Sequence, residues 1–363
     1  MTTTTTTAGT DRHAFTAPLY VAWETTHRCN ARCLHCYSAS GPDADRTGEL
    51  STQEALDVID QLADAGVVVL AFSGGEPLLR RDWAVLVSRA VSRGLSVNIG
   101  TNGATVSERR ADQLRELGVH SVTVSLDSHR PEVHDHFRRF PGLYRRTLNA
   151  IRRLVARDVR VVVGFTPTRL NWRDGPEVVA LVARLGASAV NLSEYVPAGR
   201  GPLSLALTPQ ELRSVLHEWI DMRQAYRGTL DVIWHDCRVG MLVPDDDRRK
   251  YVGCGAGRLV ARICPDGSVT PCVFLPTVIG GLREQPFRQM WTESELLAKF
   301  RVRQGLISGN CGECAFLATC GGCRAVAYAY SGGDPLAGDP HCWVLPMDPD
   351  PMAGLAAGES LPM

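Results

Sequence analysis

The chain has 363 residues, 44% of them hydrophobic, and its 39 basic side chains balance 39 acidic ones for a formal net charge of zero. A chain of this length buries a large core, enough for one large domain or two smaller ones. The neutral balance argues against a nucleic-acid-binding protein and against binding to an anionic membrane.

The sequence contains no run of about 20 apolar residues that could span a bilayer. The Thr-rich start, residues 1–17, lacks the apolar stretch of a signal peptide, and we expect it to be a disordered tail. The protein is therefore expected to be cytoplasmic. Twelve cysteines in a reducing compartment are better interpreted as metal ligands or redox groups than as disulfides.

Apolar runs of strand length alternate with segments of helical periodicity through the first two thirds of the chain. One helix is predicted over residues 51–66, from a Ser51–Glu54 capping box to Gly66. The pattern predicts a parallel sheet with right-handed crossovers, in the form of an α/β partial (β/α)6 TIM-like barrel over residues 18–235. Its active site should lie at the carboxyl ends of the strands. The predicted strands are 19–24, 67–72, 95–100, 121–126, 159–165 and 187–193.

The composition changes near residue 236, where Gly, Pro and nine of the twelve cysteines replace the helical periodicity. We interpret residues 236–345 as a small Cys-rich domain that is held together by metal. The last segment, 346–363, has the composition of a loose tail.

Three cysteines follow the first predicted strand in "CNARCLHCY": Cys29, Cys33 and Cys36. They are one ligand short of a closed tetrahedral metal site, and an open position is typical of a catalytic centre. The alternative is a structural zinc site that His27 or His35 completes.

Four motifs at predicted strand ends resemble those of radical S-adenosylmethionine (SAM) enzymes: "CNARCLHCY", "SGGEP" (73–77), "TNG" (101–103) and "SLD" (125–127). The resemblance spans residues 18 to 343. It implies that Cys29, Cys33 and Cys36 bind a [4Fe–4S] cluster and that SAM occupies its open iron. The other residues that the resemblance implies are Gly74, Gly75 and Glu76 for the amino group of SAM, Arg138 for its carboxylate, Ser125 for its ribose or carboxylate, and Tyr37 for its adenine.

Several of these residues have a simpler interpretation. "SGGEP" alone would be an ordinary turn, Arg138 a solvated helix residue, and Tyr37 a residue of the core.

The later cysteines resemble the SPASM extension of this family, which holds two auxiliary [4Fe–4S] clusters. The resemblance assigns Cys311, Cys314, Cys320 and Cys342 to one cluster. It assigns Cys254, Cys272 and Cys323 to the other, with Cys264 favoured over Cys237 as the fourth ligand, or with the position open to substrate. "CGGC" (320–323) departs from many members, which have three residues between these cysteines.

The motifs look most like those of heme-precursor-modifying members and natural-product enzymes, which oxidise or decarboxylate small substrates such as sugars and nucleosides. The predicted activity is that of an oxidoreductase or lyase, with flavodoxin or ferredoxin as electron donor. A ribosomal-peptide maturase is the alternative, although no peptide-recognition domain precedes the predicted barrel. Two alternatives belong to other classes of protein. One is a binding protein whose fold is stabilised by zinc, and the other is a non-catalytic iron–sulfur electron carrier.

Substrate contacts are expected after the sixth predicted strand and at the domain junction. "NLSEYVPAGRG" offers Glu194, Tyr195 and Arg200, of which Arg200 could bind a substrate carboxylate. "WHDC" offers His235 and Asp236 as acid–base groups. Cys237, otherwise a buried free thiol, could donate hydrogen in a redox-neutral reaction.

Overall fold

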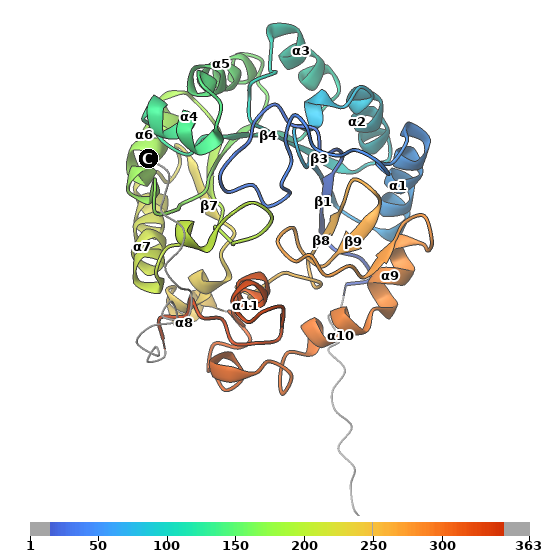
Figure 1. Ribbon diagram of the computed structural model, residues 1–363. Helices are drawn as coiled ribbons and strands as arrows, with labels where there is room; N and C mark the ends of the chain where they lie inside the picture. Colours follow the sequence, from blue (N-terminus) through green and yellow to red (C-terminus); the bar gives the residue numbers. More distant parts are fainter. Residues whose placement is uncertain (1–14, 249, 345–363) are drawn as a thin grey trace, which may run out of the picture.

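One ten-stranded sheet runs through the part of the chain that the computed structural model describes, residues 15–248 and 250–344 (Figure 1). The strand order is β10-β9-β8-β1-β2-β3-β4-β5-β6-β7. Neighbouring strands from β1 to β7 pair in parallel, β8 pairs in parallel with β1, and β9 and β10 extend the sheet antiparallel. The strands are β1 (Tyr20–Glu24), β2 (Val69–Ser73), β3 (Ser96–Thr101), β4 (Ser121–Ser125), β5 (Val161–Phe165), β6 (Ala189–Leu192), β7 (Asp231–Trp234), β8 (Val260–Ile263), β9 (Ser268–Thr270) and β10 (Gly280–Gly281).

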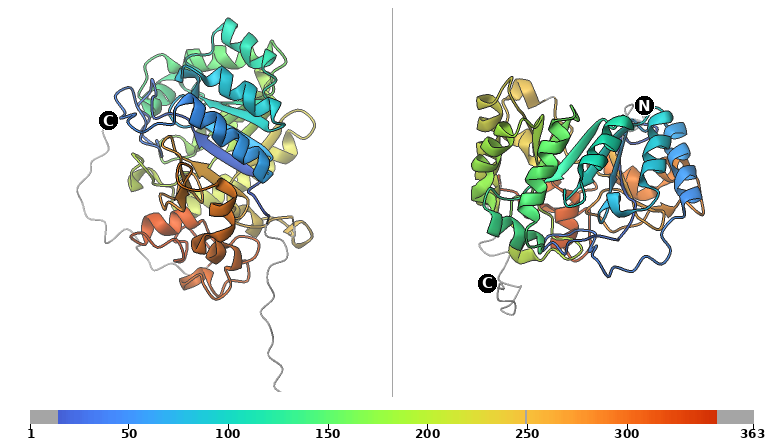
Figure 2. Two further views of the ribbon diagram at one scale, coloured as in Figure 1. Left: turned by 90° about the vertical axis from the view of Figure 1, so that its right-hand side faces the viewer. Right: turned by 90° about the horizontal axis from the view of Figure 1, so that it is seen from above.

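Helices cover the outer side of this curved sheet, and the C-terminal elements lie at its open side (Figures 1 and 2). The outer helices are α1 (Thr52–Ala65), α2 (Trp83–Ser92), α3 (Glu108–Glu116), α4 (Pro131–Arg138), α5 (Leu143–Val155), α6 (Gly175–Arg184) and α7 (Pro209–Ala225). The C-terminal helices are α8 (Asp245–Arg248), α9 (Phe287–Glu293), α10 (Glu295–Val302) and α11 (Arg324–Tyr330).

The start and end of α1 follow the sequence signals. Ser51 Oγ accepts a hydrogen bond from the backbone N–H of Glu54 at 3.3 Å, and the Glu54 carboxylate accepts one from the Ser51 N–H at 2.8 Å. Gly66 ends the helix in the left-handed region with φ 92°, a conformation that costs glycine little.

The two faces of the sheet differ in the size of their side chains. Alternate residues of a strand point to opposite faces. On the outer face, large apolar side chains such as Trp23, Phe72 and Ile99 are almost fully buried and join one core cluster with the helices. The inner face carries small or polar residues, most of them half-exposed: Ala71, Asn98, Gly100, Thr123, Ser125, Val162, Gly164 and Asn191. The core therefore lies between sheet and helices, and the inside of the barrel keeps room for a ligand.

The predicted partial barrel with a Cys-rich extension is confirmed. Each of the six predicted strands contains or overlaps one of β1 to β6. Sequence analysis did not identify β7, which has only four residues and an exposed Asp231 at its start. Three strands of the predicted second domain, β8 to β10, continue the same sheet, and the domain boundary at residues 235 and 236 stays a prediction.

Residues 1–14 and 345–363 lie outside the described residues, and they include most of the two predicted tails. No helix within residues 15–248 and 250–344 is long and apolar enough to cross a membrane.

The outer core generates a stability prediction. Leu62 on α1 is 0% exposed, so Leu62→Ala leaves a cavity and should lower the free energy of unfolding by about 2–5 kcal/mol. Val85→Ala on α2, where the side chain is 53% exposed, should change it by less than about 0.5 kcal/mol. Urea denaturation followed by tryptophan fluorescence measures both. Equal losses in the two variants would contradict the placement of the core.

Candidate functional site

The loop after β1 brings three cysteines together at the carboxyl end of the sheet. Cys29 and Cys33 are buried, and half-buried Cys36 packs against the same small cluster. The Cys29 N–H donates to the Gly41 carbonyl at 3.1 Å, so the loop folds back on itself. The three cysteines that the sequence places on one loop thus lie in one cluster in the structure.

These thiols sit in an environment that disfavours a bare thiolate. The pKa of Cys29 is raised to about 12, mainly by burial and in part by the negative charges of Glu76, Cys33 and Cys36, although the Ala31 N–H at 3.4 Å from Sγ opposes the shift. Burial likewise raises the pKa of Cys33. A cation must displace these protons on binding, since thiolates are the metal ligands.

The "SGGEP" loop after β2 is bonded directly to the cysteine loop. The N–H groups of Gly75 and Glu76 donate to the carbonyls of Thr26 and Arg28, each at 2.8 Å. A Cβ on Gly75 would lie only 2.6 Å from the carbonyl carbon of Arg28, so no larger residue fits there. The second glycine is therefore needed for the close approach of two backbones.

Glu76 is a fully buried carboxylate next to the cysteines. It accepts hydrogen bonds from Thr101 Oγ1 at 2.8 Å and from the Asn102 N–H at 2.9 Å. Burial raises its pKa to about 7, against these two hydrogen bonds. A carboxylate has further lone pairs, so Glu76 can still receive a cationic group of a ligand.

Arg138 lies inside the site, not in solvent. Its Nε donates to Asp127 Oδ2 at 2.6 Å, and its Nη1 lies 3.8 Å from Cys33 Sγ. Asp127 is the last residue of the "SLD" motif, so this motif supplies the partner of Arg138. The guanidinium is thereby fixed beside the cysteine loop, where it can also bind an anion.

Tyr37 contacts the C-terminal part, whereas Ser125 lies on the inner face of the sheet. The Tyr37 hydroxyl lies 3.2 Å from Ser73 Oγ, and its ring meets Phe274 edge-on, with 5.4 Å between ring centroids. Ser125 ends β4 and is half-exposed on the inner face.

The loop after β6 holds the cysteine loop in place. Arg200 donates to three backbone carbonyls of that loop, those of Cys33, Ala39 and Ser40, at 3.1, 3.1 and 2.8 Å. These bonds use three of the five guanidinium N–H donors, so the binding of a substrate carboxylate by Arg200 stays a prediction. The hydroxyl of Tyr195 likewise donates to the Pro202 carbonyl at 2.7 Å within its own loop.

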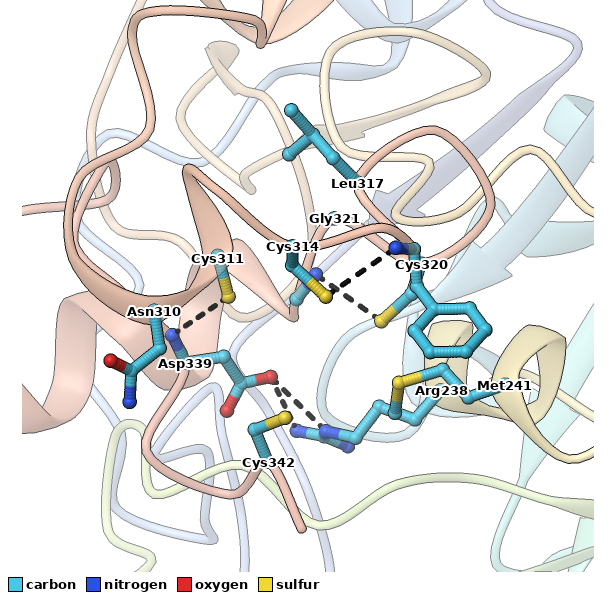
Figure 3. A pocket seen from close by; sticks show the side chains of 12 residues that line it. Arg238, Met241, Asn310, Cys311, Cys314, Leu317, Cys320, Gly321, Asp339 and Cys342 are labelled. Carbon is cyan, nitrogen blue, oxygen red and sulfur yellow. Dashed lines mark hydrogen bonds and ion pairs between the residues drawn. The ribbon is translucent and has the colours of Figure 1, made fainter. Parts of the chain in front are cut away.

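Four later cysteines line one hollow, as Figure 3 shows: Cys311, Cys314, Cys320 and Cys342. They are the four that the resemblance assigns to one cluster. The hollow measures about 320 Å³ when space open to solvent is counted. Backbone N–H groups of Phe316, Gly322 and Asp339 donate to the sulfurs of Cys314, Cys320 and Cys311 at 3.3–3.4 Å, as amides do at iron–sulfur centres.

A second apolar cluster contains Cys323, with Cys237, Cys254 and Cys272 packed against it. Burial raises the pKa of Cys272 to about 12, and the negative charge of Cys254 adds to the shift. The Cys237 side chain is also hydrogen-bonded to Cys320 of the Cys311 set. Cys254, Cys272 and Cys323 therefore form the second auxiliary set, and Cys237 lies between the two sets.

Cys264 is not part of that set. It follows β8, which pairs with β1, and the side chains that affect its charge are Arg262, Glu24, Ser268 and Asp266. The choice between Cys264 and Cys237 as fourth ligand stays a prediction. The structure favours Cys237, because residue 264 follows a strand paired with β1 whereas Cys237 packs among the other thiols.

Sequence analysis missed Arg238 and Asp339. The Arg238 guanidinium is fully buried and binds Glu194 at 2.6 Å, Asp236 at 2.9 Å and Asp339 at 3.0 Å. Asp236 and Glu194, predicted as substrate-facing groups, thus belong to a buried ionic network next to the auxiliary cysteines. His235 lies beside Asn191, with 3.3 Å between His235 Nδ1 and Asn191 Nδ2. In the sequence, the position of Arg238 directly after Cys237 was the one feature that could have drawn attention to this arginine.

Within the described part of the chain, no three His, Cys, Asp or Glu side chains converge as a single metal ion requires. The thiolates that hold a cubane cluster bind different irons and need not converge on one point. His35, an alternative zinc ligand, stacks on Phe137 with 4.2 Å between ring centroids.

Comparison with known proteins agrees with this arrangement. Residues 23–193 match the Radical SAM superfamily, and residues 254–323 match an iron–sulfur cluster-binding domain, SPASM. The chain is 34% identical over 346 residues to the AdoMet-dependent heme synthase of Methanosarcina barkeri, covering 91% of this chain and 97% of that protein. The chain belongs to the radical SAM superfamily.

One further relative and one solved structure extend the comparison. The mycofactocin maturase MftC of Mycobacterium tuberculosis is 33% identical over 338 residues, covering 90% of this chain and 83% of that protein. The crystal structure of Streptococcus suis SuiB bound to S-adenosylmethionine superposes with a TM-score of 0.76 at 18% identity, covering 91% of this chain and 78% of SuiB. This last likeness shows the fold.

The radical SAM and SPASM domains imply iron–sulfur clusters and SAM, and the residues present fit these groups. Buried thiols, amide donors to sulfur and the hollow of Figure 3 are what a cluster requires.

The contact at Gly75 generates a prediction. Gly75→Ala should force the "SGGEP" loop away from Arg28 and reduce SAM binding at least about tenfold, which corresponds to about 1.4 kcal/mol. Equilibrium dialysis of the reconstituted protein with radiolabelled SAM measures this. Gly41→Ala is the matched control, because its added Cβ meets only the flexible Arg32 side chain, at 3.9 Å. Equal binding by both variants would contradict the close approach.

Proposed function

We propose that this radical SAM enzyme holds three [4Fe–4S] clusters and oxidatively modifies a small molecule in a biosynthetic pathway. The observation that carries the proposal is the grouping of the cysteines, with three beside the "SGGEP" loop and two groups in the C-terminal part, between which Cys237 lies. Cys237 joins the set of Cys254, Cys272 and Cys323 in this assignment, and Cys264 stays a free thiol.

When bound, SAM and the first cluster supply a 5′-deoxyadenosyl radical that takes a hydrogen atom from substrate, and the auxiliary clusters supply a one-electron acceptor. The residues of the chain bind and orient SAM. Glu76, held by Thr101 and Asn102, receives the amino group, and Arg138, held by Asp127, receives the carboxylate. Tyr37 contacts the adenine and Ser125 the ribose or carboxylate.

The inner face of the barrel supports a substrate bound inside the sheet. Gly100 and Gly164 leave that face open, and Asn98, Thr123 and Asn191 offer polar groups. Enclosure there would hold the reacting C–H bond against the radical and exclude water.

The proposed substrate is a heme precursor that loses a propionate carboxylate as carbon dioxide. The 34% identity to a heme synthase over nearly the whole of both chains supports it. A small natural product such as a sugar or nucleoside would use the same chemistry. The 33% identity to MftC supports a peptide maturase as the second candidate. The proposed electron donor is flavodoxin or ferredoxin.

Turnover tests the proposal. The anaerobically reconstituted chain should contain about twelve irons and matching sulfide. With dithionite and SAM it should form 5′-deoxyadenosine, whereas Cys29→Ala should form none, because that cluster loses a ligand. Mass spectrometry should find carbon dioxide loss from a tetrapyrrole with propionate side chains. A change to a precursor peptide instead would favour the maturase.

Two outcomes would reject the proposal. Absence of 5′-deoxyadenosine above the Cys29→Ala background would leave a non-catalytic electron carrier. Stoichiometric zinc in the anaerobically purified protein would reject the cluster assignment.

The fourth ligand of the second auxiliary set has its own prediction. Cys237→Ser should destabilise that cluster and lower bound iron by up to about four per chain, because serine replaces a thiolate ligand. Cys264→Ser is the matched control and should keep the iron of the parent. Iron and sulfide analysis after gel filtration measures the clusters that each variant holds. Loss of iron in Cys264→Ser but not in Cys237→Ser would identify Cys264 as the ligand.

A further inference from the structure

Four arginines are buried among the described residues: Arg138, Arg238, Arg303 and Arg324. A buried guanidinium normally pairs with a carboxylate, because an uncompensated charge in the interior is costly. Arg138 pairs with Asp127, and Arg238 pairs with three carboxylates. Within residues 15–248 and 250–344, no carboxylate pairs with Arg303 or Arg324.

Arg324 lies against the Cys311 set. It is 2% exposed, and its Nε and Nη1 donate to the carbonyls of Gly322, Pro335 and Ala337 at 2.8–3.3 Å. Its Nη2 is buried without a hydrogen-bond partner. A Cβ built on Gly322 would lie 2.6 Å from this Nη2, 2.7 Å from Asp339 Cβ and 2.9 Å from Cys311 Sγ, so all three flank the same small space. The Asp339 carboxylate itself pairs with Arg238.

Arg303 is the second buried arginine without a paired carboxylate in the described part of the chain. It is 6% exposed and donates to the carbonyls of Val252 and Cys254. Cβ atoms built on Gly253 and Gly321 would lie 2.7 and 2.8 Å from its Nη1, so Arg303 lies between Cys254 of one auxiliary set and Cys320 of the other. One unpaired buried arginine therefore lies against the Cys311 set, and the other lies between the two auxiliary sets.

We propose that Arg303 and Arg324 are the counter-charges of the two auxiliary iron–sulfur clusters and raise their reduction potentials. A cluster held by four thiolates is anionic and gains a further negative charge on reduction. A nearby guanidinium stabilises the reduced state more than the oxidised one, and local charge and hydrogen bonds to sulfur are known to set such potentials. The proposal rests on the proposed binding of auxiliary clusters.

The test uses the full chain with Cys29→Ala, Cys33→Ala and Cys36→Ala, so that only auxiliary clusters titrate. The glutamine variants Arg324→Gln and Arg303→Gln remove the positive charge. The lysine variants Arg324→Lys and Arg303→Lys keep the charge but lose the several hydrogen bonds that the guanidinium donates to backbone carbonyls. Arg301→Gln is the matched control, because Arg301 also donates to two carbonyls, those of Gly257 and Trp291, at 3.1 and 2.7 Å. Iron and sulfide are measured first, followed by a dithionite titration monitored by electron paramagnetic resonance.

Each glutamine variant should shift one auxiliary signal to more negative potential. We expect at least about a tenfold drop in the ratio of reduced to oxidised cluster at fixed potential, which is about 59 mV for one electron. The lysine variants and Arg301→Gln should stay near the parent. Loss of a cluster in a glutamine variant but not in the matching lysine variant would also support the counter-charge role.

Three outcomes would overturn the inference: unchanged potentials in both glutamine variants, equal shifts with lysine and glutamine, or failure of both to load the cluster. The last two would mean that the carbonyl contacts matter and the charge does not. If the parent itself loads fewer than about eight irons, the proposed cluster assignment fails instead.

Discussion

The pairing of β1 with two parallel neighbours is the constraint on which the rest of this structure depends. β1 lies between β2 and β8, with Glu24 opposite Ser73 and Trp23 opposite Ile263. The cysteine loop, the "SGGEP" loop and the turn after β8 therefore leave the sheet at one level. Because the chain continues from β8 through β9 to Cys272, one hydrogen-bonded sheet connects the first cysteine set with the auxiliary sets.

Much of this arrangement could be predicted, because local signals determined it. Val-rich runs marked β1 to β6, a capping box marked α1, and the spacing of Cys29, Cys33 and Cys36 marked their common loop. The outer-face residues repeat every second position, as burial against helices requires. The grouping of Cys311, Cys314, Cys320 and Cys342 was implied by the resemblance to the SPASM extension, and these four cysteines line one hollow.

Features that depend on distant contacts could not be predicted. Cys264 lies between two assigned cysteines in the sequence, yet its strand pairs with β1 and carries it away from them. Arg200 was predicted as a substrate contact, but its partners in the structure are carbonyls more than 150 residues earlier in the chain. The role of Arg238 could not be predicted, because two of its three carboxylate partners, Glu194 and Asp339, come from distant segments.

The four buried arginines differ in how their positive charge is balanced. Arg138 and Arg238 belong to ion pairs whose protein partners balance or exceed their charge, whereas Arg303 and Arg324 bond only backbone oxygens. Backbone carbonyls orient a guanidinium without cancelling its charge. The C-terminal part therefore combines three carboxylates around Arg238 with two further buried arginines, Arg303 and Arg324, that form no ion pair among the described residues.

The unequal faces of the sheet have an evolutionary consequence. Stability comes from the large residues under the helices, whereas the inner face, with Gly100, Gly164 and Ser125, contributes little to the core. Side chains inside the barrel can therefore be exchanged at small thermodynamic cost. A scaffold built this way can acquire new specificities by drift on one face while selection for folding acts on the other.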